Sequence, residues 1–208
     1  MRYKLVLFDV DSTLINQEVI DLLAAQTPYA DEVASITSRA MAGDIDFDTA
    51  LQERVSLLEG LPESVLWDVL NEISFSQGAE RLLTSLRESQ YFIGVVSGGF
   101  TNVLSELFAD FHLDFLRANT LEIQEGRLTG RTSGPVINRQ GKAEALRDFA
   151  ARCSVTLSEC VAVGDGSNDL EMIQLAGLGV SYRGKPVLNE AADIVLNEPG
   201  LDQLLKYL

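Results

Sequence analysis

Short apolar runs alternate along this chain with longer amphipathic stretches, and this alternation constrains the fold more than any other feature of the sequence. The runs are rich in Val, Ile, Leu and Phe and are too short for helices, so they predict buried strands. The stretches between them carry apolar residues at helical spacing. The predicted strands cover residues 4–8, 91–96, 161–163, 178–180 and 194–196, and the predicted helices cover residues 79–89, 103–111, 142–152 and 169–176. Strands that alternate with helices indicate an α/β protein with a doubly wound, parallel sheet.

One long region lacks this alternation. Residues 18–71 show helical spacing without a convincing strand, which predicts a small helical cap inserted after the first strand. We expect the α/β core to comprise residues 1–14 and 75–208, and the cap to comprise residues 15–74. Trp67 is expected in the apolar core of the cap.

A second irregularity lies in residues 120–129. Apolar residues occur on both sides of Glu125-Gly126, and glycine readily adopts the positive φ of a tight hairpin turn. We therefore expect a β-hairpin here.

The charge balance restricts the binding partners. The 208 residues carry a formal net charge of −15 without a block of Lys or Arg, which argues against nucleic acid and anionic membranes. The apolar run after Lys4 is too short for a signal-peptide core or a membrane span. We therefore expect a cytoplasmic protein in which Cys153 and Cys160 are reduced. Because the overall charge would repel an anionic substrate, its site must supply cations locally.

Two carboxylates follow the first predicted strand. Asp9 and Asp11 occur in the segment Phe8-Asp9-Val10-Asp11-Ser12-Thr13, where a turn can direct both into one cleft. Hydrolysis of a phosphate monoester needs an attacking oxygen, a proton donor for the leaving oxygen and a cation. The two aspartates could supply the attacking oxygen and the proton donor. Alternatively, Asp simply favours turns, and the spacing alone does not decide between these interpretations.

The second predicted strand is followed by Ser97-Gly98-Gly99, which we interpret as a tight turn. Backbone N–H groups of such a turn can bind phosphate oxygens, and the Ser97 hydroxyl could add a donor. Glycine is also common in such turns for steric reasons alone.

Lys142 follows Gly141 at the start of a predicted helix and could neutralise phosphoryl charge, although an isolated lysine is usually a solvated surface residue.

Two further carboxylates follow a later strand. In Gly164-Asp165-Gly166-Ser167-Asn168-Asp169, Asp165 ends the strand and Asp169 lies in the first turn of the next predicted helix. Carboxylate oxygens are ligands that Mg²⁺ prefers. Asp169 also has a structural explanation, because acidic residues stabilise helix N-termini. Each of these signals is ambiguous alone, but all of them occur at strand or helix ends of one predicted α/β fold.

The four segments resemble, in order and spacing, the motifs of the haloacid dehalogenase superfamily. The resemblance implies that Asp9 is a nucleophile that becomes an aspartyl-phosphate, and that Asp11 protonates the leaving oxygen and then activates water. It implies a Mg²⁺ ion held by the Asp9 carboxylate, the Asp11 backbone carbonyl and Asp165, with Asp169 supporting these ligands. Ser97 and Lys142 would hold the phosphoryl group, and the further substrate contacts that it implies are Gly98, Gly99 and Asn168.

Residues of the predicted cap resemble those of the phosphoserine phosphatase family. The resemblance implies that Glu18 binds the substrate ammonium and that Arg54 binds its carboxylate, while Met41 and Phe47 close off the site. Patterning alone favours solvated charges and helix-packing residues at these positions. One departure is Gln52, where these phosphatases commonly carry a basic residue.

The residues and the resemblance together predict a Mg²⁺-dependent phosphomonoester hydrolase, and the resemblance implies that its substrate is phosphoserine and that it acts in the last step of serine biosynthesis. Three alternatives stay open. Water could be replaced by an alcohol such as homoserine, which would make the protein a phosphotransferase. Another small phosphomonoester could be the substrate. Finally, the chain could be a catalytically silent phosphate-binding protein.

Overall fold

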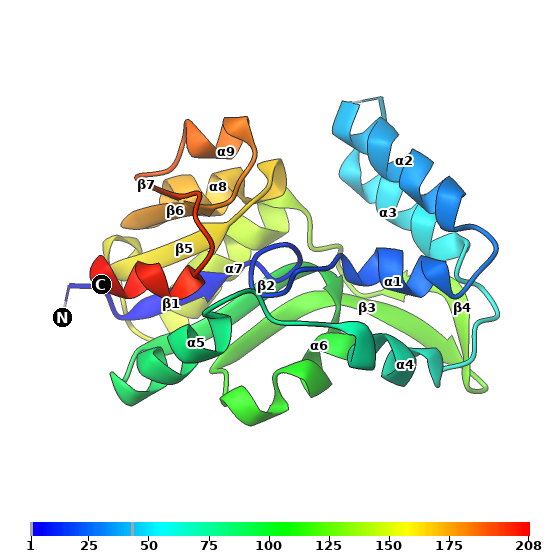
Figure 1. Ribbon diagram of the computed structural model, residues 1–208, viewed down its shortest axis with the longest axis horizontal. Helices are drawn as coiled ribbons and strands as arrows, with labels where there is room; N and C mark the ends of the chain where they lie inside the picture. The colour runs from blue at the N-terminus through cyan, green and yellow to red at the C-terminus, as the bar shows by residue number, and fades with distance from the viewer. Residues whose placement is uncertain (1, 43) are drawn as a thin grey trace.

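The computed structural model of the chain describes residues 2–42 and 44–208, apart from the side chains of residues 41 and 42. In this part of the chain, seven strands form one sheet in the order β4-β3-β2-β1-β5-β6-β7 (Figure 1). All neighbouring strands are parallel except β3 and β4. The strands are β1 (Leu5–Phe8), β2 (Phe92–Phe100), β3 (Phe115–Gln124), β4 (Arg127–Ser133), β5 (Cys160–Gly164), β6 (Leu178–Tyr182) and β7 (Ile194–Leu196).

Strand β1 lies in the middle of the sheet and is buried on both faces. Val6 and Phe8 belong to the apolar core on the face that α5 and α6 cover. Leu5 and Leu7 belong to a second core, under α7 and α8. Because successive side chains of a strand point to opposite faces, an uninterrupted apolar run serves both cores. The predicted doubly wound α/β fold is confirmed.

The first four helices of the core follow the order of the predicted helices, and α9 is a short helix that was not predicted. The helices of the core are α5 (Ala79–Glu88), α6 (Thr101–Leu107), α7 (Arg139–Arg152), α8 (Leu170–Leu175) and α9 (Pro186–Asn189). The core also contains four short 3₁₀ helices in the described part of the chain, which are η1 (Ala109–Phe111), η2 (Leu157–Glu159), η3 (Ser167–Asp169) and η4 (Leu201–Lys206). The stretch predicted as a helix over residues 103–111 is divided between α6 and η1, and helix α7 begins before the predicted start at Lys142. No helix in the described part of the chain combines the length and the apolar character needed to cross a bilayer.

Four helices form the insertion between the first strand and α5. They are α1 (Val19–Ala25), α2 (Ala30–Ala42), α3 (Phe47–Ser56) and α4 (Val65–Glu72). The two ends of the insertion lie side by side, because Ile15 forms an antiparallel bridge with Phe75 and the Ser76 N–H donates to the Leu14 carbonyl at 2.8 Å. These contacts fall at the boundary that the sequence predicts, and residues 15–74 stay a proposed domain.

The prediction for Trp67 is wrong. Its side chain is 56% exposed, whereas Val65, Leu66 and Val69 are buried. Residues two positions apart on a helix point in nearly opposite directions. Because Val65 and Val69 pack inward, Trp67 between them points to solvent.

The region of the predicted glycine turn is also different from the expectation. Strand β2 continues through Ser97 to Phe100, and its partners on β3 shift from Ser97–Ala118 to Phe100–Asn119. Gly98 and Gly99 are therefore extra residues in a β-bulge, which bends the strand instead of ending it.

The predicted hairpin is confirmed as the junction of β3 and β4. Glu125 and Gly126 form its turn with φ of 53° and 73°. Positive φ at both central residues is the signature of a tight hairpin whose twist matches that of the strands.

Candidate active site

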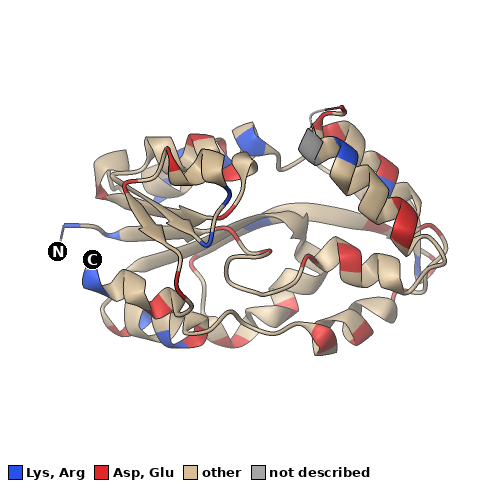
Figure 2. Cartoon of the chain, turned by 45° about the horizontal axis from the view of Figure 1, so that its top comes forward, with Lys and Arg blue, Asp and Glu red and all other residues tan. Residues whose placement is uncertain are grey.

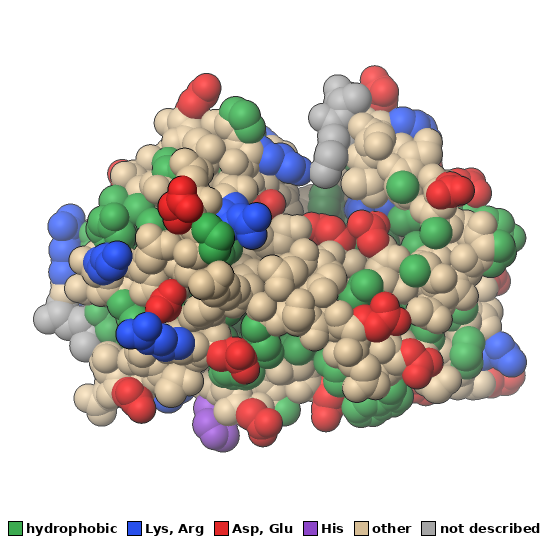
Figure 3. Space-filling model, viewed as in Figure 1, with side chains coloured by type: hydrophobic (Ala, Val, Ile, Leu, Met, Phe, Trp, Pro, Cys, Tyr) green, Lys and Arg blue, Asp and Glu red, His purple; other side chains and the backbone are tan. Residues whose placement is uncertain are grey.

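A cavity of about 570 Å³ lies where the carboxyl ends of β1 and β5 meet the helical insertion. Figure 3 shows the molecule hollowed between α8 and α9 on one side and α2 and α3 on the other. Open parallel sheets bind ligands at this edge because the loops after neighbouring strands converge there. The predicted site residues that line the cavity are Asp9, Asp11, Glu18, Phe47, Arg54, Gly98, Gly99, Asp165 and Asn168.

Asp9 follows β1 directly and is 3% exposed. Its Oδ1 accepts a hydrogen bond from Lys142 Nζ at 2.5 Å. Burial raises the pKa of Asp9 well above its ordinary value, the charge of Asp169 raises it further, and the charge of Lys142 opposes that rise. The charge of Lys142 therefore favours the ionised form of Asp9, against the effects of burial and Asp169.

Lys142 reaches this position from the first turn of α7 and is fully buried. Its Nζ also donates to Asp169 Oδ1 at 2.6 Å. Burial lowers the pKa of Lys142, but the charges of Asp169 and Asp9 outweigh burial and raise it above the ordinary lysine value. The ammonium group therefore stays charged between two carboxylates.

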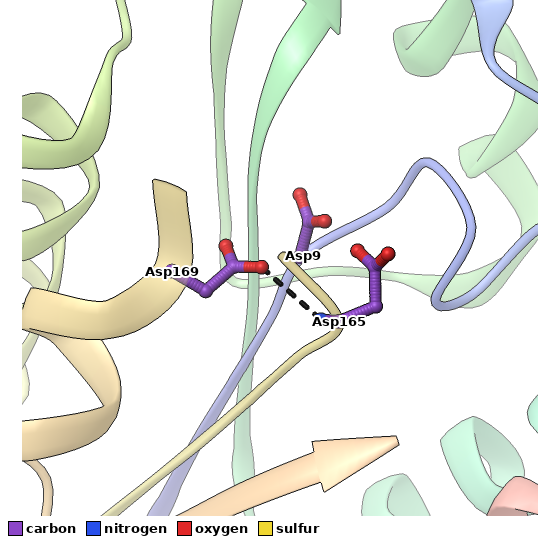
Figure 4. Close-up of side chains that lie close together, drawn as sticks. All are labelled: Asp9, Asp165 and Asp169. Carbon is purple, nitrogen blue, oxygen red and sulfur yellow. Dashed lines mark hydrogen bonds between the residues drawn. The ribbon is translucent and has the colours of Figure 1, made fainter. Parts of the chain in front are cut away.

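Asp169 has both carboxylate oxygens engaged. Besides the Lys142 contact at Oδ1, its Oδ2 accepts hydrogen bonds from the backbone N–H of Asp165 at 3.1 Å and of Gly166 at 3.0 Å. Figure 4 shows Asp169 directed from the start of α8 toward the loop that carries Asp165, with Asp9 beside them. Asp169 is thus arranged to hold the Asp165 loop in shape.

The carboxylates of Asp9, Asp165 and Asp169 can place one oxygen each within 4.8 Å of one another. Burial and the charge of Asp169 raise the pKa of Asp165 to about 6. Lys142 is one positive charge beside three clustered carboxylates, so the cluster has an excess of negative charge. A hard divalent cation fits this all-oxygen donor set and would lower the pKa values of Asp9 and Asp165.

Asp11 follows Asp9 by two residues, lines the same cavity and is 9% exposed. Its Oδ1 accepts from the Val19 N–H at 3.1 Å, and its Oδ2 accepts from Ser97 Oγ at 2.9 Å. Burial and the charge of Glu18 raise the pKa of Asp11 to about 7. A carboxyl group with this pKa can both give and take a proton near neutral pH.

The bulge of β2 brings backbone close to Asp11. A Cβ on Gly99 would lie 2.7 Å from Asp11 Oδ2 and 3.0 Å from Ser97 Oγ, so a larger residue here would displace these two side chains. Ser97 is fully buried, and its hydroxyl donates to Asp11 while it accepts from the Gly99 N–H at 2.7 Å. Ser97, Lys142 and Asp169 lie behind the cavity surface, in contact with the residues that line it.

The helical insertion contributes the opposite wall. Glu18 Oε1 accepts from Ser12 Oγ at 2.7 Å. Arg54 is half-buried on α3; burial lowers its pKa, and the charges of Asp21 and Glu18 oppose that effect. Phe47 packs on the bulge, because a Cβ on Gly98 would lie 3.1 Å from its ring.

One predicted residue lies outside the described part of the structure. The side chain of Met41, near the end of α2, is not described. Its role therefore stays a prediction.

Two cations at the cavity were missed by sequence reasoning. Arg139 Nε donates to the Ser167 carbonyl at 3.0 Å, and the Lys185 backbone N–H donates to the Asp165 carbonyl at 2.9 Å. Both side chains line the cavity. Lys185 follows strand β6, so its place after a strand end was a usable signal. Figure 2 shows Lys and Arg otherwise scattered among more numerous acidic residues.

The model of a known protein family matches residues 6–174, and its description is haloacid dehalogenase-like hydrolase. The chain is 51% identical over 205 residues to a phosphoserine phosphatase of Streptomyces coelicolor, an alignment that covers 99% of this chain and 50% of the relative. It is 40% identical over 207 residues to a phosphoserine phosphatase of Methanocaldococcus jannaschii, with 100% of this chain and 98% of the relative covered. The chain therefore spans about half the length of the first relative and nearly all of the second.

Solved structures show the same likeness. A phospho-aspartyl intermediate analogue of phosphoserine phosphatase superposes with a TM-score of 0.93 at 39% identity, and all of both chains is covered. A substrate-bound phosphoserine phosphatase complex superposes with a TM-score of 0.94 at 38% identity, covering 100% of this chain and 99% of that one. The likeness extends over the core and the helical insertion alike.

Proposed function

The chain belongs to the haloacid dehalogenase-like hydrolase family, and from this premise we propose that it is a phosphoserine phosphatase that releases serine and phosphate through a phosphorylated Asp9. One observation carries the proposal: a single cavity joins Asp9 and Asp11 with Glu18 and Arg54 from the helical insertion. The first pair supplies reacting groups, and the second pair supplies charges that match an amino acid. Phosphoserine phosphatases from several organisms are full-length relatives of this sequence.

The chemistry assigned to this chain has two displacements. A carboxylate oxygen of Asp9 attacks phosphorus, and the bond to the serine oxygen breaks while protonated Asp11 gives that oxygen its proton. Asp11 then takes a proton from water as the water oxygen attacks phosphorus and the bond to Asp9 breaks. Two displacements of this kind are easier than one direct hydrolysis. Lys142 already holds Oδ1 of Asp9, so we assign the attack to Oδ2.

We propose that Mg²⁺ is the cation of this site, held by the carboxylates of Asp9 and Asp165 and by the backbone carbonyl of Asp11. When bound, the cation offsets the charge that develops on the phosphoryl oxygens. Asp169 would support these ligands, because its hydrogen bonds shape the Asp165 loop. Hard oxygen donors and an excess of negative charge support this assignment.

The substrate would lie between the bulge and the insertion. We propose that the phosphoryl oxygens contact Lys142, Asn168 and the bulge residues Ser97, Gly98 and Gly99. Ser97 would turn its hydroxyl from Asp11 toward the substrate. Glu18 would bind the ammonium group and Arg54 the carboxylate, for which the planar guanidinium is well suited. Met41 and Phe47 would close the cavity, and the helices of residues 15–74 would act as its cap. We place the reaction in the cytoplasm, as the last step of serine biosynthesis.

Arg54→Ala tests the choice of substrate. We expect kcat/KM for phosphoserine to fall about 100-fold, because the substrate carboxylate loses a charge-assisted partner. Hydrolysis of an aryl phosphate, which has no carboxylate, should stay within about threefold of the wild type. Phosphate release is measured for both substrates and for phosphothreonine, phosphoethanolamine and a sugar phosphate.

Arg39→Ala is the matched control, because Arg39 is an exposed arginine of α2 that pairs with Glu53 and lies outside the cavity lining. Equal losses on phosphoserine and the aryl phosphate would contradict the role of Arg54. Adding homoserine distinguishes water from an alcohol as acceptor: hydrolysis predicts that phosphate and serine are released in equal amounts.

A further inference from the structure

Asn138 sets the beginning of the helix that carries Lys142. It is the N-cap residue of α7, and its Oδ1 accepts from the Gly141 N–H at 3.1 Å. Its backbone carbonyl accepts from the Lys142 N–H at 2.9 Å. An N-cap side chain satisfies a helix N–H that has no partner within the helix, and so it fixes where the helix starts. The place of Asn138 therefore influences where the Lys142 side chain enters the site.

The same side chain reaches the helical insertion. Asn138 Nδ2 donates to Asp48 Oδ1 at 2.9 Å and to Asp48 Oδ2 at 3.3 Å. Asp48 lies in the first turn of α3, next to Phe47, whose ring packs on Gly98. Two adjacent residues thus hold the N-terminus of α3 on the core.

A buried amide ties the same segment to the bulge of β2. Asn119 is 2% exposed, and its Nδ2 donates to the Gly98 carbonyl at 2.8 Å. Its Oδ1 accepts from the Ile137 N–H at 2.9 Å. The residue that precedes Asn138 is therefore fixed to the backbone on which Phe47 rests, so α3, the bulge and the start of α7 form one connected unit.

We propose that Asn138 is a positioning residue that couples the docking of α3 over the cavity to the placement of Lys142 against Asp9. The inference rests on the proposed function, because Lys142 and the insertion are given roles in it. Asparagine suits this place for a chemical reason. Its carbonyl oxygen caps α7, and its NH₂ group binds the Asp48 carboxylate, whereas no carboxylate at position 138 could do both.

The Asn138→Asp variant separates the two contacts. Its carboxylate can still accept from Gly141, so the cap of α7 is kept. It removes the donor to Asp48 and puts two negative charges side by side, so the contact with α3 is lost. The double variant Asn138→Asp with Asp48→Asn exchanges the two groups, and Asn at position 48 can donate to Asp at position 138. Gln140→Ala, at an exposed position of the same helix, is the control.

Hydrogen exchange and kinetics are then compared among these variants. We expect Asn138→Asp to speed amide exchange in residues 47–56 about tenfold and to lower kcat/KM for phosphoserine about tenfold, since a hydrogen bond to a charged acceptor has effects of this order. The exchanged pair should recover both values to within about threefold, and Gln140→Ala should change neither.

Asn138→Asp with wild-type exchange in α3 and wild-type kinetics would overturn the inference, because it would show that only the cap of α7 matters. Failure of the exchanged pair to recover either value would also overturn it. The exchange measurement needs no substrate. A wild-type protein that does not hydrolyse phosphoserine would end the proposed function, while the exchange result still decides whether Asn138 holds α3.

Discussion

The two walls of the cavity are built differently. On the core wall, Asp9, Lys142 and Asp169 are almost fully buried and hold one another through short contacts. On the insertion wall, Glu18 directly precedes α1 and is exposed, whereas Arg54 is half-buried on α3 and its Nε donates to the Ala50 carbonyl of the same helix at 3.1 Å. Buried groups with several partners have one geometry, whereas groups on a helical insertion can move with it.

This difference separates chemistry from recognition. A change on the core wall should affect the hydrolysis of every phosphomonoester, because each of them carries the same reacting phosphoryl group. A change on the insertion wall should affect only substrates that carry the groups it binds. The superfamily chemistry and the choice of phosphoserine can therefore be tested by different variants.

Lys142→Met should have the largest effect. It leaves Asp9 and Asp169 buried without their shared cation, and breaking such a contact typically costs about 3 kcal/mol of stability. We expect activity to fall on the order of 10³-fold on phosphoserine and on an aryl phosphate alike. Denaturant unfolding and phosphate release measure the two effects, with the exposed Lys206→Met as control. A loss of activity on phosphoserine but not on the aryl phosphate would contradict the assignment of chemistry to the core wall and of recognition to the insertion wall.

Asp165→Asn should change stability in an unexpected direction. Because burial and Asp169 raise the pKa of Asp165 to about 6, its ionised form costs free energy in the folded protein at neutral pH. Without divalent cations at pH 7, we expect the variant to be more stable than the wild type by on the order of 1 to 2 kcal/mol.

The pH dependence of this difference has a definite sign. The wild-type penalty is complete above the folded-state pKa, shrinks as the pH falls below it, and is absent below the ordinary aspartate value near 4. Added Mg²⁺ should stabilise the wild type and have little effect on the variant. Chemical denaturation between pH 4 and pH 8 checks this, and a variant less stable at pH 7 would contradict it.

Trp67→Ala should have the smallest effect. The side chain is 56% exposed on α4, and surface substitutions usually change stability by less than about 0.5 kcal/mol. Val69→Ala on the buried face of the same helix should cost about 2 kcal/mol. Equal losses from the two variants would show that Trp67 packs against another part of the protein.

The core wall could be predicted from the sequence because it depends on local signals. Asp9 and Asp165 each follow a buried apolar run, and parallel strands bring their carboxyl ends to one edge. The sequence places Lys142 at the start of a helix. Its burial between Asp9 and Asp169 depends on contacts with distant segments, which local patterns do not show. The bulge at Gly98 and Gly99 was misread as a turn, because glycine serves both structures.

The insertion wall depends on contacts that no local pattern shows. Asn138 and Asp48 are separated by 90 positions, and each is an ordinary helix-capping or first-turn residue by itself. In the sequence, Arg139 cannot be distinguished from an ordinary exposed arginine. Its place at the cavity becomes clear only in the fold, where α7 lies beside the loop that follows Asp165. Trp67 was misassigned because an eight-residue helix gives too few turns to define its buried face from sequence alone.

The most direct measurement is to trap the covalent intermediate. The protein is mixed with phosphoserine and Mg²⁺, quenched in acid within milliseconds, digested and examined by mass spectrometry. We expect a phosphoryl group on the peptide that contains Asp9, absent when the cation is chelated and absent in Asp9→Asn, which should be folded but inactive. Phosphate release that proceeds with no phosphorylated Asp9, or with the phosphoryl group on another side chain, would contradict the role of Asp9 as nucleophile.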